Sequence, residues 1–378
     1  MQDLKSLISK LKTKNDYKLN MIIGLDGFVD EINHIVDKRL DFSNFTRICT
    51  MKELGERIIR ASGLSTNIEL VPVHVKLGGN GPILSCALLE YDVDIIYIGA
   101  LGKPHIHSVF QDLTDKADKV FSVCNPGYTK ALELEDGKIM LGTHADLGNL
   151  TWNATKEAMG GAKNIAVLIN NTNLLGLENW TMLPHMSSIW EGLIDEVFPL
   201  IDLKNEKPFA FFDLADPEKR TKNDLSHALS LIGQFEEKFR VILGVNEKEA
   251  YEIASTYNIH VNGEYSPTEK LKRTASEICN KLNIHCFVVH TARSACCIIN
   301  KKYFEATGPY CNKPKLLTGA GDNFNAGFCL GQALNLNPTE SLLLGLSTGG
   351  YYVRHAKSPS FESVIDFIDR WDIGQLID

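Results

Sequence analysis

The segment LTGAGDNFNAGF, residues 317–328, places a glycine-rich turn directly before a helical run. Gly319 and Gly321 let the backbone turn tightly and come close to a ligand. The run from Asn323 to Leu334 is predicted to be a helix, which puts Asp322 at or just before the helix start. Because a helix N-terminus presents unpaired N–H groups, the turn is predicted to bind an anion beside a carboxylate.

The small residues Ala326 and Gly327 follow within the predicted helix. They leave room for a neighbouring backbone, so we expect this helix to pack closely against another element.

Apolar runs alternate with helical stretches along the chain. Strands are expected at residues 19–25, 94–99, 164–169, 208–213, 239–243 and 284–289. Continuous apolar strands between helices are typical of a parallel sheet covered on both faces. We therefore predict an α/β fold, with a doubly wound, mostly parallel sheet flanked by helices, as one domain over residues 1–378.

Two segments interrupt this alternation. Residues 69–77 have a strand pattern, and residues 128–141 contain two strand-like halves joined at Gly137, a hairpin signal. We expect a small β lid, with elements drawn from about 30–77 and 125–143.

Composition limits the classes of partner. The net charge is −8 and there is no large basic run, which argues against nucleic acid as a partner. No apolar run approaches membrane-spanning length, so no membrane partner is expected. The nine cysteines lack zinc-ligand spacing and are expected to be reduced thiols of a cytoplasmic protein. A homodimer is one assembly open to such a chain.

The glycine-rich turn resembles the second signature of the PfkB, or ribokinase-like, carbohydrate kinase family. The match runs from Gly319-Ala320-Gly321-Asp322 to Phe328. The resemblance implies a ribokinase-like fold. It also implies that Asp322 is the catalytic base and that Gly319, Ala320 and Gly321 form an anion hole with it.

Two further segments resemble the sugar-binding part of that family. Gly79 and Asn80 lie in a GGNGP segment similar to the first signature, which implies contact with the sugar. After the first strand the family has a sugar-binding Asp, and Asp30 fits this place best, with Asp26 as the competitor. The polar residues 170–173, which include Asn171, follow the expected strand 164–169 and are predicted to face the cleft. Contact with the substrate and a plain Asn-rich loop are the two alternatives for this segment.

The nucleotide side is also similar to the family. Asn246 and Glu249 match its Asn-x-x-Glu motif, which implies water-mediated organisation of Mg²⁺ and phosphate. The same two residues also fit the start of a capped helix. Residues 290–295, with Thr291 and Arg293, stand in place of the family's Gly-x-x-Gly nucleotide loop, with alanines at both glycine positions.

The resemblance implies an ATP- and Mg²⁺-dependent kinase that phosphorylates a hydroxyl of a sugar or sugar derivative. A nucleoside kinase and a non-catalytic ligand-binding protein on the same fold are the alternatives. The family often has an Asp-Thr pair before the glycine-rich turn, and its Asp helps to bind potassium. Because Leu316 and Leu317 stand here, we expect no potassium activation. A large rate increase when potassium replaces sodium would refute this.

Overall fold

The structure is a computed structural model that describes residues 4–13, 17–204 and 206–377. Its centre is a sheet formed by β1 (Asn20–Leu25), β5 (Asp94–Gly99), β6 (Lys119–Ser122), β9 (Leu174–Leu177), β10 (Phe209–Asp213), β11 (Arg240–Asn246), β12 (Cys286–His290), β13 (Ser294–Ile299) and β14 (Lys302–Thr307). The strand order is β14-β13-β12-β11-β10-β9-β1-β5-β6. All neighbours from β12 to β6 are parallel, and β13 and β14 add an antiparallel edge.

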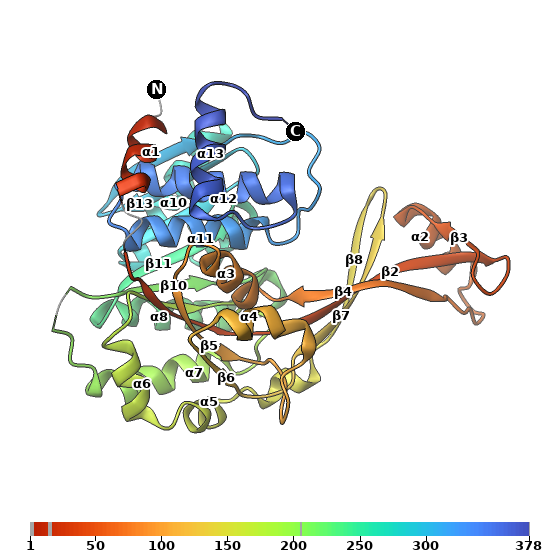
Figure 1. Ribbon diagram of the computed structural model, residues 1–378, viewed down its shortest axis with the longest axis horizontal. Coiled ribbons are helices and arrows are strands. Elements are labelled where there is room, and N and C mark those ends of the chain that lie inside the picture. The colour runs from red at the N-terminus through yellow and green to blue at the C-terminus, as the bar shows by residue number, and fades with distance from the viewer. Residues whose placement is uncertain (1–3, 14–16, 205, 378) are drawn as a thin grey trace.

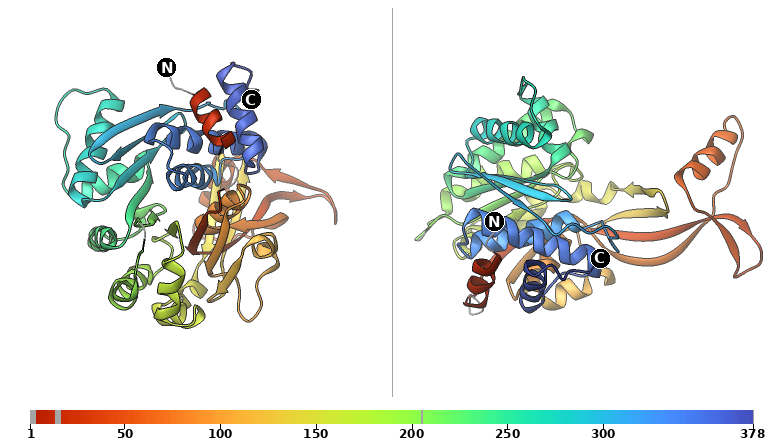
Figure 2. Two further views of the ribbon diagram at one scale, coloured as in Figure 1. Left: turned by 60° about the vertical axis from the view of Figure 1, so that its left-hand side comes forward. Right: turned by 90° about the horizontal axis from the view of Figure 1, so that it is seen from above.

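Helices cover both faces of this sheet (Figures 1 and 2). One face packs against α5 (Trp152–Ala158), α6 (Ala162–Ile169), α7 (Met186–Gly192), α8 (Lys222–Gln234), α9 (Glu247–Thr256) and α10 (Pro267–Leu282). The other packs against α1 (Leu4–Thr13), α3 (Asn80–Leu89), α4 (Gln111–Lys116), α11 (Ala320–Ala333), α12 (Pro338–His355) and α13 (Phe361–Asp372). The prediction of a doubly wound α/β fold is therefore confirmed.

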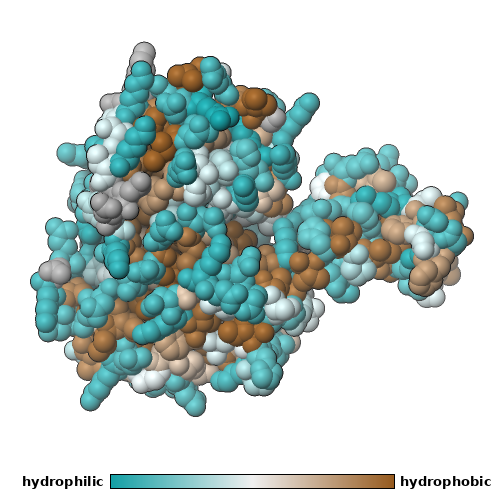
Figure 3. Space-filling view, in the orientation of Figure 1, coloured by the Kyte–Doolittle hydropathy of each residue, from teal (hydrophilic) through white to brown (hydrophobic). Residues whose placement is uncertain are grey.

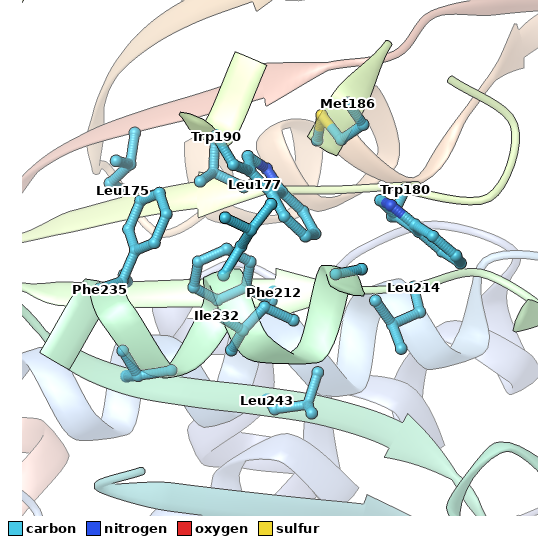
Figure 4. Close-up of a cluster of buried hydrophobic side chains, with 14 of the residues drawn as sticks. Leu175, Leu177, Trp180, Met186, Trp190, Phe212, Leu214, Ile232, Phe235 and Leu243 are labelled. Atoms are coloured by element: carbon cyan, nitrogen blue, oxygen red, sulfur yellow. The ribbon is translucent and has the colours of Figure 1, made fainter. Parts of the chain in front are cut away.

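The first of these faces has an aromatic core (Figure 4). The rings of Trp190 and Phe212 meet edge to face at 5.1 Å between centroids, and those of Phe212 and Phe235 do so at 5.0 Å. Leu177 and Leu243 fill the space beside them from β9 and β11. Burial of such side chains removes apolar surface from water and fixes these strands under α7 and α8.

A second sheet projects from the body as an arm (Figure 1). It consists of β2 (Phe28–Arg39), β3 (Phe45–Ile48), β4 (Leu70–Gly78), β7 (Gly127–Leu134) and β8 (Gly137–Thr143), and we call these strands the lid. Their order is β3-β2-β7-β8, with β4 also paired to β2. The helix α2 (Met51–Arg60) packs on the distal part through a small cluster that includes Leu54, Ile35 and Leu132.

One strand prediction was wrong. Residues 164–169 belong to α6, and the strand that follows is β9. Within that run Ile165, Ala166 and Ile169 are buried, which is the spacing of one helical face rather than of a strand. The error moved the expected end of the strand to the wrong edge of the sheet.

The parallel strands end at a common edge, and α11 begins beside it. In open α/β sheets ligands bind at this carboxyl edge. Within the described residues, no helix is both long enough and apolar enough to cross a lipid bilayer.

Candidate active site

The glycine-rich turn forms the start of α11. Gly319 is the N-cap residue with φ of 94°, a left-handed conformation that favours glycine. Asp322 is therefore the third residue of the helix rather than a residue at its boundary. The Ala320 N–H is already bonded to the Leu317 carbonyl oxygen at 3.1 Å. The expected anion hole thus reduces to the N–H groups of Gly321 and Asp322, which helix geometry leaves without a partner in the same helix.

Asp322 lies almost buried at the carboxyl edge, with 8% of the residue exposed. Its Oδ1 accepts a hydrogen bond of 2.9 Å from Asn80 Nδ2. Burial, with a smaller contribution from the nearby Asp26 carboxylate, raises the pKa of Asp322 to about 7. A carboxyl group with such a pKa can accept a proton near neutral pH, as a general base must.

Asp26 is bound into the start of α3. Its carboxylate accepts hydrogen bonds of 2.9 Å from each of the Asn80 and Gly81 N–H groups, and one of 2.7 Å from Asn179 Nδ2. Gly79 caps this helix with φ of 101°, and a side chain there would meet Asp26 Oδ2 at 2.9 Å. These contacts give Asp26 and Gly79 a structural role in holding Asn80 against Asp322.

Asp30 lies on the lid strand β2. The sequence analysis had placed it only after the first strand, without a strand of its own. It pairs with Lys76 of β4 and Thr129 of β7. Side chains of paired residues share a face of a sheet, so these three side chains project together. Burial raises the pKa of Asp30, opposed by the charge of Lys76 and a hydrogen bond from Thr129.

Asn246 and Glu249 form a complete capping box at the start of α9. Asn246 Oδ1 accepts from the Glu249 N–H at 3.0 Å, and Glu249 Oε2 accepts from the Asn246 N–H at 2.9 Å. Glu249 Oε1 accepts from the Asp216 N–H at 2.8 Å. Both residues therefore stabilise the start of α9. They also lie at the carboxyl end of β11.

Two buried acids complete the site and had not been assigned to it. Glu178 follows β9 and is fully buried, and neither carboxyl oxygen has a hydrogen-bond partner among the described residues. Asp213 ends β10, where its Oδ2 accepts from Asn325 Nδ2 at 3.1 Å. Burial first, then neighbouring carboxylates, raises the pKa of each acid well above its usual value.

These acids could have been found from the sequence. Glu178 follows the short apolar run Leu174–Leu177, the same signal that marked Asp26. The strand wrongly assigned to residues 164–169 hid it. Asp213 is the last residue of the expected strand 208–213.

A cavity of about 400 Å³ adjoins the glycine-rich turn. Thr291, Ala320 and Gly321 line it, together with Gly345, Gly349 and Gly350 of α12. His290 lines it as well, and removal from water lowers the pKa of His290 to about 4, so the imidazole is neutral. The cavity is open to the N-terminal turn of α11, where a phosphate would be bound.

The loop after β12 is held as a turn by Thr291, whose hydroxyl accepts from the Ser294 N–H at 3.0 Å. Arg293 lies beside a separate cavity of about 570 Å³. Its guanidinium carbon is 3.6 Å from the centroid of the Tyr310 ring, a cation–π contact.

Asn171 does not join the other residues. It lies at the end of α6, before β9, and its side-chain amide donates to the Val167 carbonyl oxygen at 2.8 Å. Its neighbour Asn173 donates its N–H to Asn20, the first residue of β1. Asn171 is therefore at the amino edge of the sheet, opposite Asp322, and the prediction that it faces the substrate loses its basis.

The structure thus brings Asp26, Gly79, Asn80, the glycine-rich turn and Asp322 into direct contact or sequence neighbourhood. Asp30, Asn246, Glu249 and Thr291 lie on the elements around this centre.

Comparison with known proteins gives the same picture. A family model described as prokaryotic ketohexokinase matches residues 13–371. A ketohexokinase of Haloferax volcanii is 25% identical over 350 residues, covering 92% of this chain and 90% of the relative.

Two solved structures show the shared fold. A ribokinase of Arabidopsis thaliana complexed with ribose and ATP has a TM-score of 0.63 at 12% identity, covering 93% of this chain and 98% of that one. A mutant phosphofructokinase-2 of Escherichia coli has a TM-score of 0.62 at 13% identity, covering 94% and 99%. The match of the family model over nearly the whole length shows that this chain belongs to the prokaryotic ketohexokinase family and is a carbohydrate kinase.

Proposed function

We propose that this kinase transfers the γ-phosphoryl group of ATP to a hydroxyl group of a ketohexose, with Asp322 as the general base. The observation that carries this proposal is the position of Asp322. It is an acid with a pKa of about 7, in the first turn of a helix beside a cavity of about 400 Å³. The substrate class comes from the relative named a ketohexokinase.

In this mechanism the sugar oxygen attacks the γ-phosphorus and its proton passes to the Asp322 carboxylate. The bond from the γ-phosphorus to the bridging oxygen breaks, and ADP leaves with the electron pair. The N–H groups of Gly321 and Asp322, with the dipole of α11, stabilise the charge on the transferred group. Asn80 keeps the base in place through its 2.9 Å hydrogen bond.

The sugar is proposed to lie between Asp322 and the lid. Asp30 then accepts hydrogen bonds from sugar hydroxyls, since a carboxylate has four acceptor positions. The lid covers the sugar and reduces access of water to the phosphoryl group.

ATP is proposed to occupy the cavity beside Thr291, with its base against the glycines of α12 and its phosphates at α11. Arg293 is proposed to contact the nucleotide from the rim of the neighbouring cavity.

The donor set also fits Mg²⁺. Hard cations take oxygen ligands, and here Glu178 has two buried carboxyl oxygens with no partner in the described structure. We propose that Asn246, Glu249 and Asp213 hold Mg²⁺ with Glu178, partly through water. The ion, when bound, offsets the negative charge of the ATP phosphates.

We place this reaction in the cytoplasm, since the described cysteines are all free thiols, as expected in a reducing compartment.

ADP release tests the proposal. Wild-type protein and Asp322→Asn would be assayed with fructose, ribose and adenosine as acceptors. We expect turnover with fructose above the other two and a loss of about 10²- to 10⁴-fold in kcat for the variant. Faster turnover of adenosine would favour the nucleoside kinase. Equal inactivity of both proteins on every acceptor would favour the non-catalytic alternative.

A further inference from the structure

A lysine of the lid contacts the catalytic turn across the site. Lys138 lies at the start of β8, and its Nζ donates a 2.9 Å hydrogen bond to the Thr318 hydroxyl. Thr318 directly precedes Gly319, the N-cap of α11. The Thr318 carbonyl oxygen accepts from the Tyr352 hydroxyl at 2.9 Å, so the body holds this residue in place.

The pairing of the lid strands explains why this lysine reaches the site. Lys138 pairs with Glu133, which lies an even number of residues from Thr129 on β7. Residues at even spacing share a face of a strand, so Lys138 is on the same face as Thr129 and Asp30. Its neighbours are Glu133 at 3.9 Å and the charges of Asp30 and Lys76.

The site is rich in acidic side chains, and a positively charged lysine would offset negative charge there. Asp26, Glu178, Asp213 and Asp322 form no ion pair with Lys or Arg in the described residues, and all four are buried. A triphosphate brought to this acidic centre needs cations beside its transferred group. The side chain that is hydrogen-bonded to Asp322 is that of Asn80, in the GGNGP segment. Asn80 is neutral and therefore supplies no positive charge.

We infer that Lys138 is a catalytic residue that the lid delivers to the phosphoryl group. Its ammonium moves from the Thr318 hydroxyl to a non-bridging oxygen of the γ-phosphoryl group at the start of α11. There it offsets the negative charge that builds up as the bond to ADP breaks. This inference rests on the proposed function, because it assigns a role within that reaction.

Three variants separate this role from a merely structural latch. Lys138→Met keeps the length of the side chain and removes the charge. Thr318→Val removes the latch partner and keeps the ammonium. Lys130→Met is the matched control, because Lys130 lies on the same hairpin but faces the other way, 3.5 Å from Glu31.

We expect Lys138→Met to lower kcat about 100-fold, the size of effect seen when one group that stabilises transition-state charge is removed. Lys138→Arg should recover much of this loss. Thr318→Val should stay within about 3-fold of the wild type, and Lys130→Met should be unchanged. Equal losses for Lys138→Met and Thr318→Val would show a latch and overturn the inference.

Nucleotide affinity measured by calorimetry distinguishes failure of this inference from failure of the proposed function. If Lys138 contacts the γ-phosphoryl group, Lys138→Met weakens binding of a non-hydrolysable ATP analogue about 10-fold and leaves ADP affinity nearly unchanged. This holds whichever acceptor is used, or none. Equal affinity changes for both nucleotides, or no change for the analogue, would refute the contact. Thermal melting of each variant, with Lys138→Gln as a second neutral variant, checks that the fold is intact.

Discussion

At the scale of single residues, Asp322 combines several features in one position. It lies in the first turn of α11, is hydrogen-bonded to Asn80 and is nearly buried. Removal from water, more than the nearby acid, accounts for its raised pKa. The residue therefore titrates within the pH range in which the enzyme would work.

The pH dependence of the rate tests this assignment. A base must be deprotonated, so kcat/KM should rise with pH and level off above about 7, the pKa of Asp322. The residual rate of Asp322→Asn should lack this limb. If the limb remained in the variant, another group would be the one that titrates.

Asp26 and Asp30 are competitors for the sugar-binding position, and their different contacts predict different effects of substitution. Asp26→Asn should destabilise the protein by about 1–3 kcal/mol, because an amide NH₂ would face the N–H donors of α3. Asp30→Asn should raise KM for the sugar with little change in the melting temperature. Thermal melting and steady-state kinetics on both variants measure the two effects, and the reverse outcome would exchange the two roles.

Sequence reasoning succeeded where a residue's role depends on its near neighbours. The glycine-rich turn, the capping box of Asn246 and Glu249, and the hairpin at Gly137 are local patterns and were recognised. The hydrogen bond from Asn80 to Asp322 joins residues 242 positions apart, and no local pattern encodes it. The prediction for Asn171 lost its basis for a different reason. The helical run 164–169 was assigned as a strand, and this put Asn171 at the carboxyl edge of the sheet instead of the amino edge.

At the scale of elements, the packing of α11 on α12 holds the glycine-rich turn in place. A methyl group added to Gly327 would meet the Leu344 carbonyl oxygen at 2.8 Å and would also collide with Thr348 Oγ1. The expectation that small residues here allow close packing is therefore confirmed. Overpacking forces backbone shifts, and these would be felt at Asp322 in the same helix.

Gly327→Ala should destabilise the protein by about 1–3 kcal/mol. Gly55→Ala is the matched control, since Gly55 also lies inside a helix, α2, but has no atom within 4 Å of the added methyl group. The control should be neutral or stabilising by up to about 1 kcal/mol, because alanine favours helix. Denaturant unfolding of the two variants measures this, and similar losses in both would contradict the packing argument.

At the scale of the whole molecule, the lid arm extends away from the body and exposes apolar side chains (Figure 3). Phe42 is 96% exposed and Leu40 is 67% exposed near its tip. Exposed apolar surface of this kind favours association. We therefore predict that two copies of the chain associate as a homodimer through this part of the lid arm.

Light scattering in solution should give twice the chain mass of 42.1 kDa. Phe42→Ser combined with Leu40→Ser should shift the protein toward the monomer, because the double variant removes apolar surface from the contact. A mass of one chain for the wild type at all concentrations would exclude the dimer.

The cluster of buried acids at the carboxyl edge affects the thermal stability of the protein. A folded-state pKa raised by burial means that stability is lost as pH rises through that pKa, so Asp26, with a pKa of about 6, and Asp322 weaken the fold near neutrality. Mg²⁺ bound with nucleotide beside these carboxylates should favour their ionised forms and raise the melting temperature, by a larger margin at pH 8 than at pH 5.5. Without bound Mg²⁺ and nucleotide the protein would unfold at a lower temperature. The lifetime of the folded enzyme would therefore depend on the supply of the nucleotide that it uses.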